Sequence, residues 1–545
     1  MKVLKPVYIT GAIALALIGC KSVVTIPVPK GTDNVVNIIA KKTPLTKVQK
    51  ESWGHADLAT DTIPGMSIAK AYAFLSDKKG VEVIVGVVDS GTDLKHEDLK
   101  ANAWINPKEI PNNQKDDDNN GYVDDINGWN FLGPIHKENA EVERILKNPK
   151  LVDAATYQII KAAQDKKVAN AGTSKMQFTQ MLQAVQFADN TLAEHLKKKA
   201  YTQDEVKNIT SDKTFVKQSV NIAKQMYGFG LSSLTQAISE IKKEIKNAED
   251  LLSGANLKTN YREPLKDDAQ DFTTQSYGDG KVGPFVKEEA HGSHVSGIIG
   301  ALRNNNVGIN GVANNVKIMA VRVVPEGDEY DKDVALGIRY AVDNGAKVIN
   351  ASFGKSYSPN KQWVYEAIKY AAEKDVLIVH AAGNDGKDID TKNNFPNDSE
   401  VFNNEISDNY ISIGAISSNY NEKLPADFSN YGKVNVDIFA PGVQIYSTTP
   451  ENEYAYFNGT SMAAPGVAGI AALIRSYYPK LSASQVKHII MNSGTKIDFE
   501  VIKPGSVDEK TPKGIMVPFS ELSVTGRIVN AYNALKMANR IVNGK

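Results

Sequence analysis

The chain has 545 residues, of which 42% are hydrophobic and 23% are charged. This length allows one large domain with additional material, or two or three ordinary domains, and the composition is that of a globular protein. Basic and acidic residues are equal at 63 each and no long basic run occurs, so the charge gives no support for a nucleic-acid partner.

The first twenty residues have the pattern of a secretory signal. Lys2 and Lys5 precede an apolar stretch at positions 7–18, which is too short for a stable membrane span. The closing segment Leu17-Ile18-Gly19-Cys20 resembles a bacterial lipobox. That resemblance implies lipid attachment at Cys20 and a membrane-anchored protein of the bacterial cell envelope, on the periplasmic or the outer surface.

Cys20 is the only cysteine in the chain, so an intramolecular disulfide is excluded. The alternative to lipidation is an unmodified cysteine after a plain signal peptide. Residues 21–50 are polar, contain proline, glycine and threonine, and show no amphipathic period. We predict that they form a tether.

A nearly continuous β-branched run extends from Val81 to Val88, which predicts a central parallel strand buried on both faces. Asp89 stands at the carboxyl end of this strand. Ligands and catalytic groups gather at that end of the strands in open α/β sheets. A lone aspartate at a strand end would nevertheless be structural more often than catalytic.

Residues 116–127 have the spacing of an EF-hand calcium loop, with oxygen-bearing side chains at positions 1, 3, 5 and 9 and glycine at position 6. The candidate ligands are Asp116, Asp118, Asn120, Tyr122 through its carbonyl, and Asp124. Position 12 is Asn127, where a bidentate glutamate is expected, and no helical pattern flanks the loop. The alternatives are therefore a structural calcium ion and a solvated turn rich in Asp and Asn.

Residues 134–262 are mostly rich in Ala, Lys, Glu and Gln. Apolar residues recur at spacings of three and four from Leu231 to Leu252, and another apolar face extends from Phe178 to Leu196. We predict a helical hairpin or a small bundle. It serves either as a solvated spacer at the side of the main domain or as a lid or partner-docking arm.

The segments that follow predict a doubly wound, mostly parallel α/β sheet. Residues 291–300 carry small residues at every third or fourth position, which lets a helix pack closely in a core. Residues 316–324 and 346–351 are predicted strands with a helical pattern between them. Residues 376–385 are a further strand that ends in a Gly-Asn turn.

Residues 458–465 predict a tight turn that leads into a buried helix over the small-residue run 466–474. Ser461 falls at the start of this helix, where its side chain is presented to a site. Its backbone N–H lies at the positive end of the helix dipole, where a developing oxyanion would be stabilised. The alternative is an ordinary helix cap, because Ser and Thr are preferred capping residues.

The segments 89–99, 291–300 and 458–465 together resemble the aspartate, histidine and nucleophile segments of the subtilisin-like serine proteases, in the order of that family. The resemblance implies that Ser461 is the nucleophile, His291 the general base and Asp89 the residue that orients the histidine. It implies that Asn384 is the oxyanion donor. The expected substrate-binding residues are Ser352, Phe353, Gly354, Ala382 and Gly383.

By this resemblance, residues 1–20 are a lipoprotein signal peptide, and residues 51–133 and 263–545 form a catalytic domain that the helical segment 134–262 interrupts. The tether is too short to be a folded pro-segment of the kind usual in the family, so we expect none. The implied activity is an endopeptidase that forms an acyl-enzyme, binds polypeptides as extended strands and requires no cofactor for catalysis.

The alternative is a catalytically inactive lipoprotein of the same fold that acts as a binding module through its helical insertion. Degenerate enzymes usually lose a triad or oxyanion residue, and here none is missing by type.

Overall fold

The computed structural model describes residues 40–401 and 404–544. Cys20, the predicted signal peptide and most of the predicted tether lie outside the described residues. Within the described ranges, no helix combines the length and the apolar character that crossing a membrane requires.

The folded domain begins earlier than the predicted end of the tether at residue 50. Helix α1 (Lys47–Ser52) starts inside that segment. The Thr46 hydroxyl accepts a hydrogen bond from Gln49 N at 3.3 Å, and Gln49 Oε1 accepts one from Thr46 N at 3.1 Å. This reciprocal cap is built from polar residues. Composition alone therefore could not distinguish the helix from a tether, and the boundary is corrected to about residue 46.

The centre of the fold is a sheet with the strand order β12-β15-β9-β8-β5-β4-β1-β3-β2. Neighbouring strands are parallel from β2 through to β15, and only β12 pairs antiparallel. The predicted doubly wound, mostly parallel α/β sheet is confirmed. The strands are β1 (Val83–Asp89), β2 (Gly128–Asn130), β3 (Val316–Arg322), β4 (Val348–Ala351), β5 (Leu377–Ala381), β8 (Tyr410–Ile416), β9 (Ile438–Pro441), β12 (Thr495–Lys496) and β15 (Arg527–Ile528).

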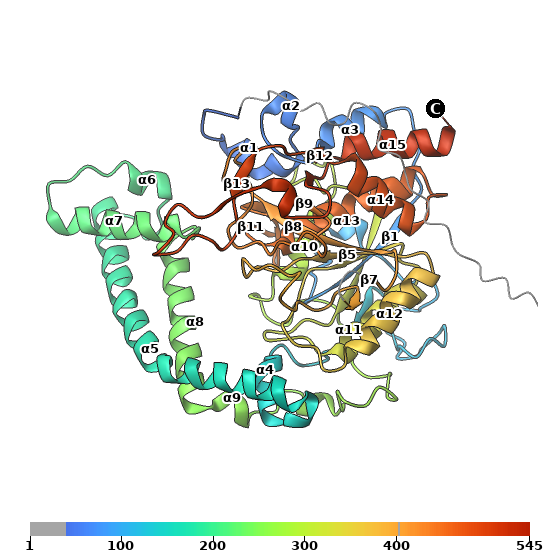
Figure 1. Ribbon diagram of the computed structural model, residues 1–545, viewed down its shortest axis with the longest axis horizontal. Helices are drawn as coiled ribbons and strands as arrows, with labels where there is room; N and C mark the ends of the chain where they lie inside the picture. Colours follow the sequence, from blue (N-terminus) through green and yellow to red (C-terminus); the bar gives the residue numbers. More distant parts are fainter. Residues whose placement is uncertain (1–39, 402–403, 545) are drawn as a thin grey trace, which may run out of the picture.

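Helices cover both faces of this sheet (Figure 1). One face packs against α11 (Asp331–Asp343) and α12 (Lys361–Glu373). The other packs against α3 (Ile68–Phe74), α10 (His291–Gly300), α13 (Thr460–Tyr477), α14 (Ala483–Ser493) and α15 (Ala531–Asn543). Because both faces are covered, β1 is apolar along its whole length, as expected for a central parallel strand.

Smaller elements complete this domain. They are α2 (Leu58–Asp61), β6 (Ser399–Val401) with β7 (Asn404–Glu405), β10 (Ile445–Thr449) with β11 (Glu453–Phe457), and β13 (Glu500–Ile502) with β14 (Met516–Pro518). Short 3₁₀ turns lie at Trp53–His55, Lys100–Asn102, Pro149–Leu151, Glu263–Leu265 and Phe519–Glu521.

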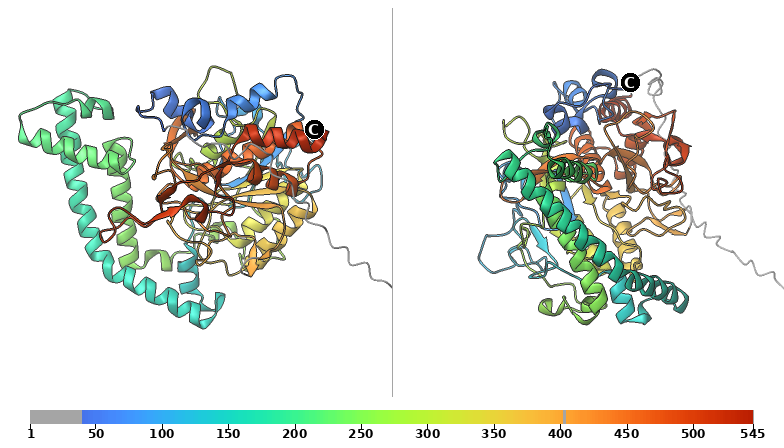
Figure 2. Two further views of the ribbon diagram at one scale, coloured as in Figure 1. Left: turned by 45° about the horizontal axis from the view of Figure 1, so that its top comes forward. Right: turned by 90° about the vertical axis from the view of Figure 1, so that its left-hand side faces the viewer.

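Residues 141–258 form a helical arm that projects from the sheet domain (Figures 1 and 2). Its helices are α4 (Glu141–Lys147), α5 (Ala154–Leu196), α6 (Gln203–Lys207), α7 (Thr214–Gly228), α8 (Leu234–Ser253) and α9 (Ala255–Lys258). The two apolar faces noted in the sequence meet here, because Val185 of α5, Val220 of α7 and Ile241 of α8 belong to one buried cluster. The arm therefore has a small core of its own.

Candidate active site

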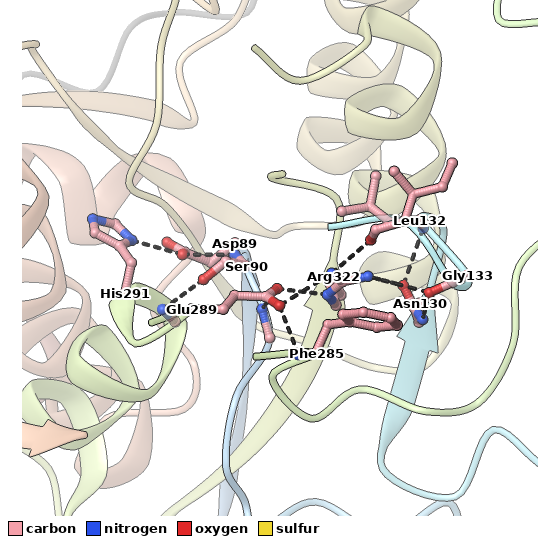
Figure 3. A network of polar contacts seen from close by, with 12 residues as sticks. Asp89, Ser90, Asn130, Leu132, Gly133, Phe285, Glu289, His291 and Arg322 are labelled. Carbon is pink, nitrogen blue, oxygen red and sulfur yellow. Dashed lines mark hydrogen bonds and ion pairs between the residues drawn. The ribbon is translucent and has the colours of Figure 1, made fainter. Parts of the chain in front are cut away.

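Asp89 and His291 lie together although 202 positions separate them in the chain. Asp89 ends β1 and His291 begins α10. His291 Nδ1 is 2.7 Å from Asp89 Oδ1, which also accepts a hydrogen bond from Ser90 N at 2.7 Å. The carboxylate is fully buried, whereas 37% of the His291 side chain is exposed. Figure 3 shows the second ring nitrogen of His291 pointing away from Asp89.

Two opposing effects act on the pKa of His291. Burial lowers this pKa, but the negative charge of Asp89 and its hydrogen bond to Nδ1 raise it, and the net shift is upward from the ordinary value. The imidazolium form is thus stabilised by its neighbour. Because a carboxylate can only accept, Nδ1 carries the proton, and Nε2 of the neutral ring is left as the base.

A buried ionic network holds the start of α10 against the sheet (Figure 3). Glu289, two positions before His291, receives hydrogen bonds from Gly91 N at 2.7 Å and from Arg322 Nε at 2.6 Å. Arg322 pairs in register with Asp89 across β1 and β3, and its Nη1 donates to Asn130 Oδ1 of β2 at 3.0 Å. The ends of three strands are thereby tied to the segment that carries His291.

Ser461 lies in the first turn of α13 and is only 9% exposed. Its hydroxyl donates to the Ser352 carbonyl at 3.0 Å, and the Ser352 hydroxyl donates to the Ser461 carbonyl at the same distance. Ser352 lines the same cavity as His291. Among the described residues, Ser461 makes no hydrogen bond to His291. Catalytic hydrogen bonds are often long or incomplete before substrate binds.

Asn384 lies beside Ser461 with its amide oxygen already engaged. Asn384 Oδ1 accepts hydrogen bonds from Thr460 N at 2.8 Å and from Thr460 Oγ1 at 3.0 Å. The donating Nδ2 group is therefore left for another partner. The Ser461 N–H is a second donor, because a first-turn N–H has no partner within the helix. The two donors can together receive a negatively charged oxygen.

The segments 352–354 and 382–383 follow β4 and β5, which are neighbours in the sheet. Asn394, which we did not predict from the sequence, connects them. Its Nδ2 donates to the Ala382 carbonyl at 3.0 Å, and a methyl group built on Gly354 would lie 3.3 Å from its Oδ1. Asn394 thus links the two segments that carry the five predicted substrate-binding residues.

Asn430 is a second residue that sequence reasoning missed. Its Nδ2 donates to the Ala382 carbonyl at 2.9 Å, and its Oδ1 accepts from Asp385 N at 3.1 Å. It holds the turn that carries Asn384. Gly383 has a φ of +100°, and a methyl group there would lie 2.4 Å from Asn430 Nδ2, so this turn requires glycine. The Ser-Asn pair at 429–430 looked like ordinary loop sequence.

The predicted calcium loop is only partly as expected. Carboxylate oxygens of Asp116, Asp118 and Glu109 lie within 4.8 Å of one another. Asp124 instead accepts hydrogen bonds from the backbone N–H groups of residues 113 and 114, and the Asn120 amide donates to Asp125 Oδ2 at 3.1 Å. The acidic group among the described residues therefore contains Glu109, which was not predicted, and does not contain the predicted Asp124. Glu109 lies before the loop, so the loop spacing could not reveal it.

A model of the Subtilase family matches residues 80–510 of the chain. Subtilisin DY of Bacillus licheniformis is 39% identical over 208 residues, which cover 38% of this chain and 71% of that protein. Thermitase of Thermoactinomyces vulgaris is 41% identical over 208 residues, covering 38% and 68%. A thermophilic serine proteinase of Bacillus sp. (strain AK1) is 43% identical over 187 residues, covering 34% and 42%.

Proposed function

The chain belongs to the subtilase family and is a subtilisin-like serine endopeptidase, and on that premise we propose that Asp89, His291 and Ser461 form its catalytic triad. The observation that carries the assignment is the 2.7 Å contact between His291 Nδ1 and Asp89 Oδ1. It supports a general base whose orientation and protonation are set by a buried carboxylate.

In the proposed reaction, Ser461 Oγ attacks the peptide carbonyl carbon while His291 Nε2 takes the hydroxyl proton. The tetrahedral oxyanion receives hydrogen bonds from Asn384 Nδ2 and the Ser461 N–H. His291 then protonates the leaving amine, and an acyl-enzyme remains. Water, deprotonated by His291, hydrolyses the acyl-enzyme and restores Ser461. The substrate lies extended beside Ser352–Gly354 and the facing residues Ala382 and Gly383.

We expect diisopropyl fluorophosphate to inactivate the enzyme by phosphorylating Ser461 alone, since only a serine activated by a neighbouring base reacts readily. Mass spectrometry of a digest locates the label. The variant His291→Ala should remain unlabelled, because it lacks the base. A label on another serine would contradict the assignment, and a wild-type protein that takes no label would favour the inactive binding module.

We propose that Cys20 carries a lipid anchor and places the enzyme at a bacterial envelope membrane, on the basis of the lipobox-like segment Leu17–Cys20. A single acyl chain binds membranes only marginally, so stable anchoring requires more than one chain on this residue. We expect Cys20→Ser to abolish incorporation of labelled fatty acid and recovery in the membrane fraction. Continued labelling of the variant would show that the lipid is attached elsewhere.

We further propose that Glu109, Asp116 and Asp118 hold a structural calcium ion that takes no part in catalysis. Glu109 is 7% exposed, and its Oε2 has no hydrogen-bond partner among the described residues. A buried carboxylate oxygen without a partner is costly, and a cation beside it would remove that cost. Oxygen-only donors are the ligands that calcium prefers.

Removal of calcium by EGTA should lower Tm by several degrees, because an ion at a hundred times its Kd stabilises the folded state by about 2.7 kcal/mol. The kcat at 25 °C should not change. Asp118→Asn should remove the calcium dependence of Tm, whereas the matched variant Asp124→Asn should keep it. If Asp124→Asn removes the dependence and Asp118→Asn does not, the ligand set is wrong.

A further inference from the structure

The helical arm is fixed to the sheet domain at its root by buried charges. Glu141 Oε2 lies 2.7 Å from Arg144 Nη2 and 2.6 Å from Lys355 Nζ, and Lys355 also contacts Asp331 at 2.8 Å. At the other end of the arm, Arg262 pairs with Asp333 at 2.8 Å. Lys355 directly follows the substrate segment 352–354, so the root is held beside the cleft.

One helix of the arm reaches into the proposed substrate cleft. A cavity of about 520 Å³ is lined by His291, by the segment 352–354, by Glu326 and by Lys243 of α8. Lys243 forms no ion pair with any described residue. Figures 1 and 2 agree that α8 lies between α5 and the sheet domain. Through Lys243, α8 thus contributes to the lining of a cavity whose other lining residues lie outside the arm.

The turn between α7 and α8 lies near the segment that precedes Ser461. A methyl group built on Gly230, in the turn between α7 and α8, would lie 3.5 Å from Asn458 Nδ2. Asn458 precedes Ser461 by three positions. Its Oδ1 accepts a hydrogen bond from Gln444 N at 2.6 Å, which fixes the side chain. The arm therefore contacts the sheet domain at its root and beside Ser461, and α8 lies between the two contacts.

From these contacts, and resting on the proposed function, we propose that α8 closes the cleft from above, so that the enzyme takes single extended segments of unfolded polypeptide. The helix covers about 14 Å from its start at Leu234 to Lys243. An extended strand rises about 3.3 Å per residue, so a segment of about four substrate residues has the same length.

The cross-section of the cleft decides which chains fit. A single strand can run below α8 and pair with the segment 352–354. A hairpin adds a second strand about 4.8 Å to the side of the first, and a loop that belongs to a folded domain cannot enter without that domain. Both would meet α8. Unfolded or terminal segments are therefore the substrates that the covered cleft accepts.

The root offers a place to shorten the arm. Asn139 Nδ2 donates to the Asn256 carbonyl at 2.8 Å, and Asn256 Nδ2 donates to Glu143 Oε1 at 2.9 Å, so α4 and α9 are neighbours. Replacing residues 149–253 by a short Gly/Ser linker keeps this root, and the length of a loop affects the entropy of closing it only weakly.

The shortened and the full-length enzyme are compared on two substrates. These are one small disulfide-bonded protein in its native form and the same protein in its reduced, alkylated form.

We expect the shortened enzyme to cleave the unfolded form as fast as the full-length enzyme does. Its preference for the unfolded over the native form, measured as the ratio of kcat/KM, should fall about tenfold. An unchanged ratio would overturn the proposal. Because the ratio compares two substrates on one active enzyme, it is independent of the Ser461 labelling result that tests the proposed function.

Discussion

Ser461→Ala is expected to lower kcat for peptide hydrolysis by about 10⁶-fold, the magnitude measured for the nucleophile of subtilisin, a relative in the same family. The substitution removes one oxygen atom, whose only hydrogen bond among the described residues is the one donated to the Ser352 carbonyl at 3.0 Å. The free energy of unfolding should therefore change by only about 1 kcal/mol. Hydrolysis of a chromogenic peptide and thermal unfolding measure the two effects.

Ser476→Ala is a matched control for this prediction. Ser476 lies in the same helix, α13, and its hydroxyl donates to the Val81 carbonyl at 2.7 Å. The control loses this bond and the one that the hydroxyl accepts from Asn315 Nδ2 at 3.2 Å, so it should cost at least as much stability as Ser461→Ala without lowering kcat. If Ser461→Ala turns over peptide like the wild type, Ser461 is not the nucleophile.

Much of the fold could be predicted because local apolar and small-residue patterns in the sequence indicate its strands and helices. The apolar run before Asp89 could only be a strand covered on both faces, and β1 is that strand. The small-residue segments 291–300 and 460–474 could only be helices in close contact with a core, and α10 and α13 pack against the sheet. Once the strands are parallel, their carboxyl ends meet at one edge, which brings Asp89 near the segments that follow β4 and β5.

The parts that could not be predicted depend on contacts between loops that are distant in the sequence. Asn394 and Asn430 both donate to the Ala382 carbonyl, yet each stands in irregular sequence with no period to mark it. Glu109 joins the acidic group from outside the loop that suggested calcium. In each case the side chain is placed by tertiary structure, which spacing along the chain does not describe.

The helical arm likewise has a part that could be predicted from the sequence and a part that could not. The apolar spacing of residues 231–252 indicated a helix with one buried face, and α8 buries that face against α5 and α7. The direction of the arm was not predictable, because it depends on buried ion pairs such as Glu141 with Lys355, which join the start of the arm to a distant segment of the sheet domain. In the proposed covered cleft, those pairs hold the root from which the arm extends.

Asp89→Asn is expected to lower kcat by about 10⁴-fold while the protein remains folded. Asp89 Oδ1 accepts from both His291 Nδ1 and Ser90 N, and Oδ2 is buried with no hydrogen-bond partner in the part of the chain that the structure describes. If the amide keeps its oxygen at the Oδ1 position, its NH₂ group is buried with no acceptor. If the amide group is flipped, its NH₂ group faces two other donors, His291 Nδ1 and Ser90 N. The first orientation keeps the tautomer that leaves Nε2 as the base but buries an unpaired NH₂ group. The second disfavours that tautomer, and neither orientation supplies negative charge.

The same variant should also change the pH dependence of the residual activity. Burial lowers the pKa of His291, and the charge and hydrogen bond of Asp89 reverse that shift. With asparagine the burial remains and the charge is lost, so the pKa of His291 should fall. His291 acts as a base only when neutral, and it would then stay neutral to lower pH. The acid limb of the kcat/KM profile should therefore move to lower pH, although the plateau is far below that of the wild type.

Asp93→Asn, in the loop after β1, is the control for this shift. It should leave both the plateau and the acid limb in place, because the Asp93 carboxylate accepts from backbone N–H groups of residues 95 and 451. An acid limb that moves to higher pH in Asp89→Asn would mean that Asp89 does not stabilise the charged form of His291.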